Sequence, residues 1–355
     1  MNRFFSDKFA GLVPYVPGEQ PQDQKYVKLN TNESPFPPSP AVVEAMHKAG
    51  ESANLYCDPT CGALCRAIAQ MYGIKPENVL PVNGSDEILY FAVMAFCDDA
   101  HPLAYADITY GCYPVFADFN RVPSHIIPLR EDFTLDVDDY CGLNETIVIA
   151  NPNAPTGIAL SRAEIEKIIR SNPDNVVIID EAYGAFGAES CVDLIDKYDN
   201  LLITQTFSKS HSLAGARLGF GFACPSLLAD INAIKYSTNP YNVNRMTQAA
   251  GVAAAADNDY YLNNCRIIQE NRAYTVRALE ALGFSVLPSS ANFIFARTDR
   301  MEGGALYRAL KRDGVLVRHF DKARISDYLR ISIGTREQMD ILIEKTRRIL
   351  EQEGT

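Results

Sequence analysis

Short apolar runs alternate with helical stretches along the first two thirds of the chain. Between about residues 75 and 225, seven runs rich in β-branched and aromatic residues begin near positions 79, 102, 126, 146, 175, 201 and 218. The runs are apolar at consecutive positions, which is typical of strands covered on both faces. This rhythm predicts an α/β fold in which helices cover both faces of a mostly parallel sheet.

One helix start can be read residue by residue. Ser161 and Glu164 form the S-x-x-E pattern of a capping box ahead of the stretch EIEKIIR. The helix should therefore begin after Ser161 and stop at Asn172-Pro173, because proline cannot continue it. This helix would connect two of the predicted strands.

The last third of the chain has a different pattern. A long helical segment begins near residue 245, and the apolar runs FSVLP, ANFIFAR, GVLVR and LRISI follow it before a final helix. This pattern predicts a second, smaller α+β unit. We expect an N-terminal segment (1–40) that packs with the small domain, a large domain (41–245) and a small C-terminal domain (246–355).

Composition and charge narrow the possible functions. The 355 residues are 47% hydrophobic and 22% charged, enough for one large and one smaller domain. A formal net charge of -11 without a basic run argues against nucleic acid or an anionic membrane surface as the main partner. The N-terminus lacks the apolar core of a secretory signal, and no stretch reaches the ~18 apolar residues of a membrane span, so we expect a cytoplasmic protein.

The cysteines and histidines do not indicate a metal site. Nine cysteines in a chain without an export signal are expected to be reduced thiols. Cys57, Cys61 and Cys65 are spaced to share a helix face, but no histidine or second cysteine pair nearby completes a zinc shell. The five histidines show no metal spacing, so no metal is expected.

Reactive residues follow the apolar runs, where the strands of an open α/β sheet would end and ligands collect. They are NGSDE from Asn83, NPNAPTG from Asn151, DEAY from Asp180, Ser208 with Lys209, and Arg217. Singly, each is a weak signal, because a lysine after a strand is usually a solvated loop residue. Their order at the ends of one sheet favours a single catalytic site. The glycine turn in NGSDE opens a helix whose free N–H groups can bind phosphate.

With these motifs in view, the chain resembles the fold-type I pyridoxal 5'-phosphate (PLP) aminotransferases, and within them the histidinol-phosphate aminotransferase family. The resemblance covers nearly the whole chain. Besides the motifs above, it is carried by PYVPG (Pro14 to Gly18), LNTNESP (Leu29 to Pro35), LYCDP (Leu55 to Pro59), ITYGCY (Ile108 to Tyr113), TFSKSHSLAGARLG (Thr206 to Gly219), VLVRHF and YLRISIGT. It implies PLP bound in the large domain and a homodimer with shared active sites.

The resemblance also implies a role for each matching residue. Lys209 would bond covalently to the cofactor and then carry the transferred proton, while Asp180 would face the pyridine nitrogen and Tyr183 the ring oxygen O3'. The phosphate would be held by the Ser85 and Asp86 N–H groups after Gly84, and by Thr206, Ser208 and Arg217. Further cofactor contacts are implied for Tyr110, which would stack on the ring, Asn153 and Tyr56.

The substrate contacts implied by the resemblance come from both ends of the chain. Arg330 would take the substrate α-carboxylate in two parallel hydrogen bonds. Tyr15, Asn32, Tyr56 and Arg318 would border the remainder of the substrate, with Tyr56 reaching across a dimer interface.

The chain departs from the family pattern at two positions. The family usually has asparagine before Pro-Thr-Gly as a second partner of O3', whereas this chain has Ala154. Either Asn153 compensates or this hydrogen bond is absent, at a cost of about 1 kcal/mol. The family also favours Tyr-Pro-Asp-Pro where this chain has Cys57 in place of the first proline.

The leading hypothesis is a ping-pong aminotransferase that acts on histidinol phosphate and 2-oxoglutarate in histidine biosynthesis. An aminotransferase for aromatic or other amino acids is an alternative. A threonine-phosphate decarboxylase-like PLP enzyme is another, because it shares the core motifs. A non-catalytic PLP-fold protein should lack the lysine, the aspartate or the carboxylate arginine, and all three residue types are present here.

Overall fold

The seven predicted runs form one sheet. The computed structural model describes residues 2–353, and the strand order within them is β2-β8-β7-β6-β5-β3-β4. The strands are β2 (Val79–Val82), β3 (Leu103–Ala106), β4 (Ser124–Ile127), β5 (Thr146–Ala150), β6 (Val177–Asp180), β7 (Leu201–Thr206) and β8 (Gly219–Phe222). Strands β3 to β7 are parallel, and β8 is antiparallel to both β7 and β2. Six strands therefore end at the same edge, and the prediction of a mostly parallel α/β sheet is confirmed.

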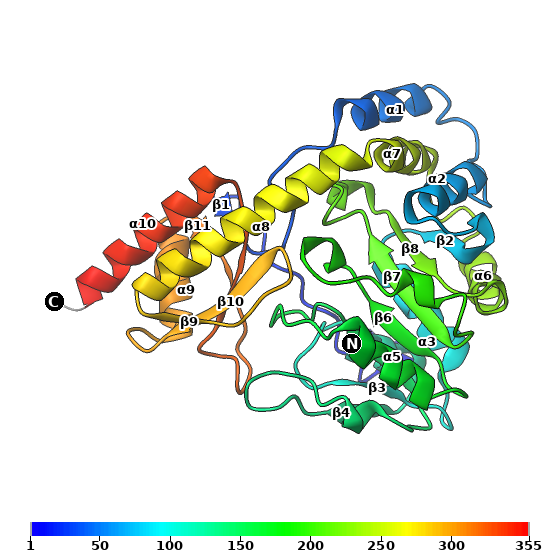
Figure 1. Cartoon of the computed structure of the whole chain (residues 1–355), viewed down its shortest axis with the longest axis horizontal. Helices are drawn as coiled ribbons and strands as arrows, with labels where there is room; N and C mark the ends of the chain where they lie inside the picture. The colour runs from blue at the N-terminus through cyan, green and yellow to red at the C-terminus, as the bar shows by residue number, and fades with distance from the viewer. Residues whose placement is uncertain (1, 354–355) are drawn as a thin grey trace.

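Helices cover both faces of this sheet (Figure 1). Along β6, Val177 and Ile179 enter a core shared with α2, α5 and α7, whereas Ile178 enters a core shared with α3, α4 and α6. These helices are α2 (Gly62–Tyr72), α3 (Ser85–Phe96), α4 (Tyr113–Asn120), α5 (Arg162–Ser171), α6 (Pro225–Thr238) and α7 (Arg245–Ala256). Because both faces are buried, consecutive strand residues are apolar.

Helix α5 begins at the predicted capping box. The Ser161 N–H donates to Glu164 Oε2 at 2.7 Å, and the Glu164 N–H donates to Ser161 Oγ at 3.4 Å. The helix ends at Ser171, directly before Asn172-Pro173. Both ends of the predicted helix are therefore confirmed.

A smaller α+β unit follows the long helix α8 (Asn258–Ala281), which runs from α7 toward α10 in Figure 1. Its antiparallel sheet has the order β12-β13-β10-β9. The remaining elements are β9 (Phe284–Val286), β10 (Phe293–Thr298), α9 (Gly303–Arg312), β11 (Val315–Leu316), β12 (Arg318–His319), β13 (Leu329–Ser332) and α10 (Arg336–Glu353). This unit has its own buried core of apolar side chains from α8 to α10.

The N-terminal segment contacts both units. Strand β1 (Val27–Lys28) pairs in parallel with β11, and the Leu29 N–H donates to the Leu316 carbonyl at 2.7 Å. Helix α1 (Pro40–Gly50) then buries Val42 in the core that it shares with α7. No helix within residues 2–353 has the length and apolar character needed to cross a bilayer.

His211 connects the loop after β7 to α8. Its buried ring stacks on Phe207, with 4.0 Å between the ring centroids, and packs against Tyr261 of α8 at 4.7 Å. Its Nε2 lies 3.2 Å from Asn258 Oδ1, and its Nδ1 lies 2.8 Å from Ser210 Oγ. Burial lowers the pKa of His211 to about 4, so the ring is neutral in the folded protein at neutral pH.

We predict that this neutral histidine makes the protein acid-sensitive. A histidine in the unfolded chain has a pKa near 6.5, so unfolding takes up a proton as the pH falls from about 6.5 toward 4. His211 should therefore remove roughly 3 kcal/mol from the free energy of unfolding over that range. Urea unfolding between pH 4 and 7 should show a weaker pH dependence for His211→Gln. The exposed His47→Gln control should follow the wild type, and parallel curves for His211→Gln and wild type would contradict the prediction.

Candidate active site

A cavity of about 220 Å³ opens at the carboxyl edge of the large sheet. Asp180 is the last residue of β6 and Thr206 the last residue of β7, and the small unit and the N-terminal segment also contribute residues to the cavity lining. Thirteen of the residues predicted from the sequence line this cavity: Tyr15, Asn32, Ser85, Asp86, Tyr110, Asp180, Tyr183, Thr206, Ser208, Lys209, Arg217, Arg318 and Arg330.

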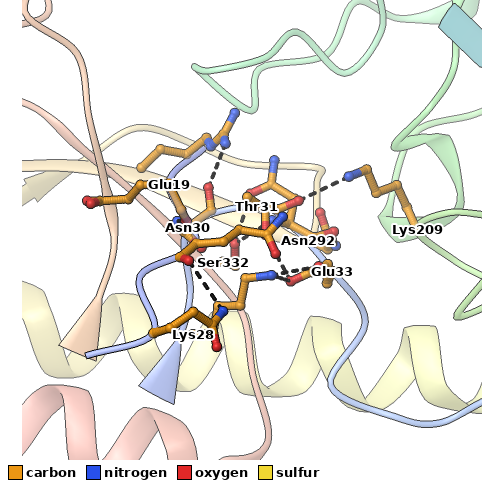
Figure 2. Close-up of polar contacts among 12 residues, drawn as sticks. Glu19, Lys28, Asn30, Thr31, Glu33, Lys209, Asn292 and Ser332 are labelled. Atoms are coloured by element: carbon orange, nitrogen blue, oxygen red, sulfur yellow. Dashed lines mark hydrogen bonds and ion pairs between the residues drawn. The ribbon is translucent and has the colours of Figure 1, made fainter. Parts of the chain in front are cut away.

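Lys209 extends from the turn after β7 into the cavity. Its Nζ donates to the Thr31 carbonyl at 3.1 Å and lies 5.8 Å from the centre of the Tyr183 ring. Figure 2 shows this side chain reaching toward Thr31. Within residues 2–353 the Lys209 amine forms no ion pair. Its hydrogen-bond partner is the backbone carbonyl of Thr31.

Asp180 supplies a buried carboxylate at the end of β6. Its Oδ2 accepts a hydrogen bond from Tyr113 Oη at 2.8 Å, and its Oδ1 accepts one from the Ala182 N–H at 3.1 Å. Burial raises the pKa of Asp180 to about 6, against the lowering effect of these two hydrogen bonds. A cationic ligand group beside this carboxylate would favour its ionised form.

Hydroxyl and guanidinium donors gather beside the first turn of α3. Arg217 Nη1 donates to Ser208 Oγ at 3.4 Å, and Arg217 Nη2 lies 3.4 Å from Asp86 Oδ2. Thr206 Oγ1 donates to Ser208 Oγ at 2.9 Å. Together with the free N–H groups of a helix N-terminus, these donors can bind a phosphate group.

Two glycines allow this cluster to be compact. Gly84 has a φ of 82°, and a Cβ there would lie 2.3 Å from Arg217 Nη2. A Cβ on Gly219 would lie 2.3 Å from the Ser85 backbone nitrogen. The close approach of β8 and Arg217 to the α3 N-terminus therefore requires glycine at both positions.

Tyrosines line the two sides of the cavity. The Tyr110 hydroxyl donates to Asp86 Oδ1 at 2.8 Å, and the Tyr110 ring lies 6.0 Å from the Tyr15 ring. The Tyr183 hydroxyl accepts a hydrogen bond from Asn32 Nδ2 at 3.0 Å. The cavity therefore presents aromatic surface as well as charged groups.

Two arginines of the small unit bring positive charge to the cavity. Arg330 Nη2 donates to the Asn30 carbonyl at 3.0 Å, while its shielded Nε has no hydrogen-bond partner. Arg318 donates to the carbonyls of Val16 and Pro17, both at 3.3 Å. Neither arginine forms an ion pair within residues 2–353, and burial lowers the pKa of Arg330. This uncompensated charge suits an anionic ligand.

The structure places three of the expected residues outside the cavity lining. Gly84 lies behind Arg217, as described above. Asn153 was expected to contact the cofactor, but it does not line this cavity. Its side-chain amide instead hydrogen-bonds with the Ile108 carbonyl, Thr156 Oγ1 and Thr109 Oγ1. Tyr56 is 79% exposed and stacks on Tyr241, with 4.5 Å between the ring centroids.

Tyr113 and the Thr31 carbonyl belong to the site but were not among the residues predicted from the sequence. Tyr113 follows Tyr110 by three residues at the start of α4, and this spacing is the local signal that could have directed attention to it. Its contact with Asp180 spans 67 positions, and the Lys209 contact with Thr31 spans 178. No pattern in the sequence indicates either pair.

The chain is similar to known proteins over nearly its whole length. Residues 24–345 match the model of the aminotransferase class I and II family. The histidinol-phosphate aminotransferase of Acinetobacter baumannii is 48% identical over 346 residues, 96% of each chain, and that of Brachyspira hyodysenteriae is 47% identical over 352 residues, 99% of each chain. The crystal structure of histidinol-phosphate aminotransferase from Sinorhizobium meliloti in complex with pyridoxal-5'-phosphate has a TM-score of 0.88 at 23% identity, and the match covers 99% of this chain and 98% of that one.

We predict that Gly219→Ala disturbs the first turn of α3. The added methyl group would collide with the backbone of Gly84 and Ser85, so this variant should lose about 1–3 kcal/mol of unfolding free energy. It should also gain less thermal stability from inorganic phosphate than the wild type gains. Thermal melting with and without phosphate measures both effects. Gly215→Ala is the control, because a Cβ there meets no atom within 4 Å. Equal melting behaviour of the two variants would refute the prediction.

Proposed function

The chain belongs to the class I and II aminotransferase family, and on that premise we propose that it binds pyridoxal 5'-phosphate and transfers the amino group of L-histidinol phosphate to 2-oxoglutarate. The observation that supports this choice of substrate is that the positive charges of Arg318 and Arg330 have no ion-pair partner among the described residues. Both arginines line the cavity that contains Lys209. The relatives at 44–48% identity named as histidinol-phosphate aminotransferases support the same assignment.

The cavity residues fit this cofactor. Lys209 is placed to bond to it covalently, the buried Asp180 carboxylate to hold a proton on its ring nitrogen, and Tyr183 to donate to its ring oxygen. The donors beside the first turn of α3, defined above by Thr206, Ser208 and Arg217, fit its phosphate. When bound, the cofactor supplies an electron sink for the charge that develops at the substrate α-carbon.

The protein groups would then orient the substrate and move its α-proton. The Lys209 amine would take the proton from the substrate α-carbon, as a general base, and deliver it, as a general acid, to the cofactor carbon on the other side of the transferred nitrogen. The Thr31 carbonyl holds this amine at 3.1 Å in the present structure, which gives it a defined position. No metal is needed in this proposal.

The arginines would allow two different anions to use one pocket. Histidinol phosphate presents a phosphate, and glutamate presents two carboxylates. The planar guanidinium of Arg330 suits bidentate pairing with either group, and Arg318 adds a second cation beside it. Tyr15, which lines the same cavity, would close the outer side of the substrate.

We further propose a cytoplasmic homodimer in which Tyr56 completes the partner's site. The exposed apolar side chains around Tyr56 include Leu55 at 61%, Tyr241 at 39% and Met246 at 38% exposure, and a second subunit would cover them. All nine cysteines are free thiols, and we include a reducing compartment in this proposal.

Absorbance spectroscopy tests the cofactor, the chemistry and the substrate together. The PLP-saturated wild type should show a visible cofactor band that histidinol phosphate and glutamate convert to the pyridoxamine form. Lys209→Ala should lose the conversion by at least about a hundredfold. A wild type without the band would disprove the cofactor assignment. A band that responds to glutamate and phenylalanine but not to histidinol phosphate would assign an aromatic substrate, and CO₂ release from O-phosphothreonine would assign decarboxylation.

We predict that Arg318→Gln separates phosphate recognition from carboxylate recognition. Removing one charged hydrogen-bonding partner should lower kcat/KM for histidinol phosphate by about 10- to 100-fold. The half-reaction with glutamate should change less if Arg330 is the main carboxylate partner. Single-turnover rates for both compounds measure the split, and equal losses for the two would contradict these roles. Lys322→Gln is a matched control, because it removes a positive charge from an exposed position of the neighbouring loop.

A further inference from the structure

Asn32 occupies an unusual place in the cavity wall. It is 1% exposed and has a φ of 55°, a left-handed conformation that few non-glycine residues adopt. Its backbone N–H donates to Ser332 Oγ at 2.8 Å, and its carbonyl accepts from Asn292 Nδ2 at 2.9 Å. The residue is thus held firmly by the small unit, whereas its side chain reaches Tyr183 of the large unit.

Ser332 determines which way the Asn32 amide is turned. The Ser332 hydroxyl already accepts the Asn32 N–H, and its own proton is donated to Asn32 Oδ1 at 2.9 Å. Turning the amide over would leave that proton without an acceptor within the described residues. Nδ2 is therefore the atom directed at Tyr183.

The direction of the amide in turn fixes the direction of the Tyr183 hydroxyl proton. Asn32 Nδ2 can only donate, so the Tyr183 oxygen accepts at 3.0 Å and its own O–H is directed elsewhere. Within residues 2–353, no side chain or carbonyl takes that proton. Tyr183 lines the cavity. Ala154 packs against Tyr183 and lines the same cavity, but it has no polar side-chain atom that could accept the Tyr183 proton.

We propose that Asn32 is a positioning residue that directs the Tyr183 O–H toward the ring oxygen of the cofactor. This inference rests on the proposed function, and it replaces the expectation that Asn32 binds substrate. With alanine at position 154, Tyr183 donates to that oxygen without the asparagine that the family usually has there. The hydrogen-bonded series Ser332–Asn32–Tyr183 therefore has a larger effect on the ring oxygen in this protein than it would have in a protein with a second donor to that oxygen.

The test is the pH at which the absorbance of the bound cofactor changes. A donor to the ring oxygen stabilises its anionic form, so losing the donor moves the transition to higher pH. Asn32→Asp keeps an acceptor for Ser332 but presents a second acceptor to Tyr183, which turns the Tyr183 proton away. This variant should raise the transition by about one pH unit. Asn32→Gly suits the left-handed backbone and removes the amide without offering an acceptor, so its shift should be smaller.

A double-mutant cycle separates proton direction from simple charge. If Asn32→Asp acts through Tyr183, its shift should disappear in a Tyr183→Phe background. Other charged or titratable groups near Tyr183 are retained throughout: Tyr15, Tyr113, Lys209 and Arg330. If Asn32→Asp shifts the transition pH in the Tyr183→Phe background as much as it does in the wild type, the proposal is overturned. It is also overturned if both Asn32 variants keep the wild-type transition pH and show only a raised KM.

The same measurements distinguish this inference from the proposed function. A wild type that forms no cofactor band would reject the proposed function itself. A normal wild-type band with insensitive Asn32 variants would reject only the role of Asn32. Ser332→Ala provides an independent check, because it releases the amide and should shift the transition in the same direction as Asn32→Gly.

Discussion

Three consecutive backbone carbonyls hold the active site together. They belong to the buried segment that follows β1, and side chains from both units donate to them. The pairs are Thr31 O with Lys209 Nζ (Figure 2), Asn30 O with Arg330 Nη2, and Asn32 O with Asn292 Nδ2. Buried carbonyls must be paired, because leaving one without a partner costs about as much as a lost hydrogen bond. The segment therefore fixes where the small unit's arginine lies relative to the lysine of the large unit.

The cavity around this segment contains charges of both signs that lack full partners. Burial raises the pKa of Asp180 and lowers that of Arg330, so each ionised form is disfavoured by its surroundings. A ligand with a cationic ring nitrogen at one end and anionic groups at the other would relieve both penalties. The binding energy of such a ligand would come largely from groups already in position.

The fold could be predicted from the sequence because its determinants are local. A strand buried on both faces must be apolar at consecutive positions, and Ser161 and Glu164 lie one helical turn apart. The position of the cavity could be predicted as well, because parallel strands end at one edge of the sheet and the residues at and after their ends meet there. Asp180, Lys209 and Arg217 were therefore recognisable before any contact was known.

The sequence by itself determined the strands, the capped helix and the types of chemical group at the strand ends. Only the tertiary structure decided how the side chains that bear those groups are oriented. Asn153 faces Thr109 instead of the cavity, and Asn32 directs its amide to Tyr183 because Ser332, 300 positions away, fixes it. Side-chain direction depends on partners brought together by packing, and the spacing of residues along the chain carries no record of such long-range pairs.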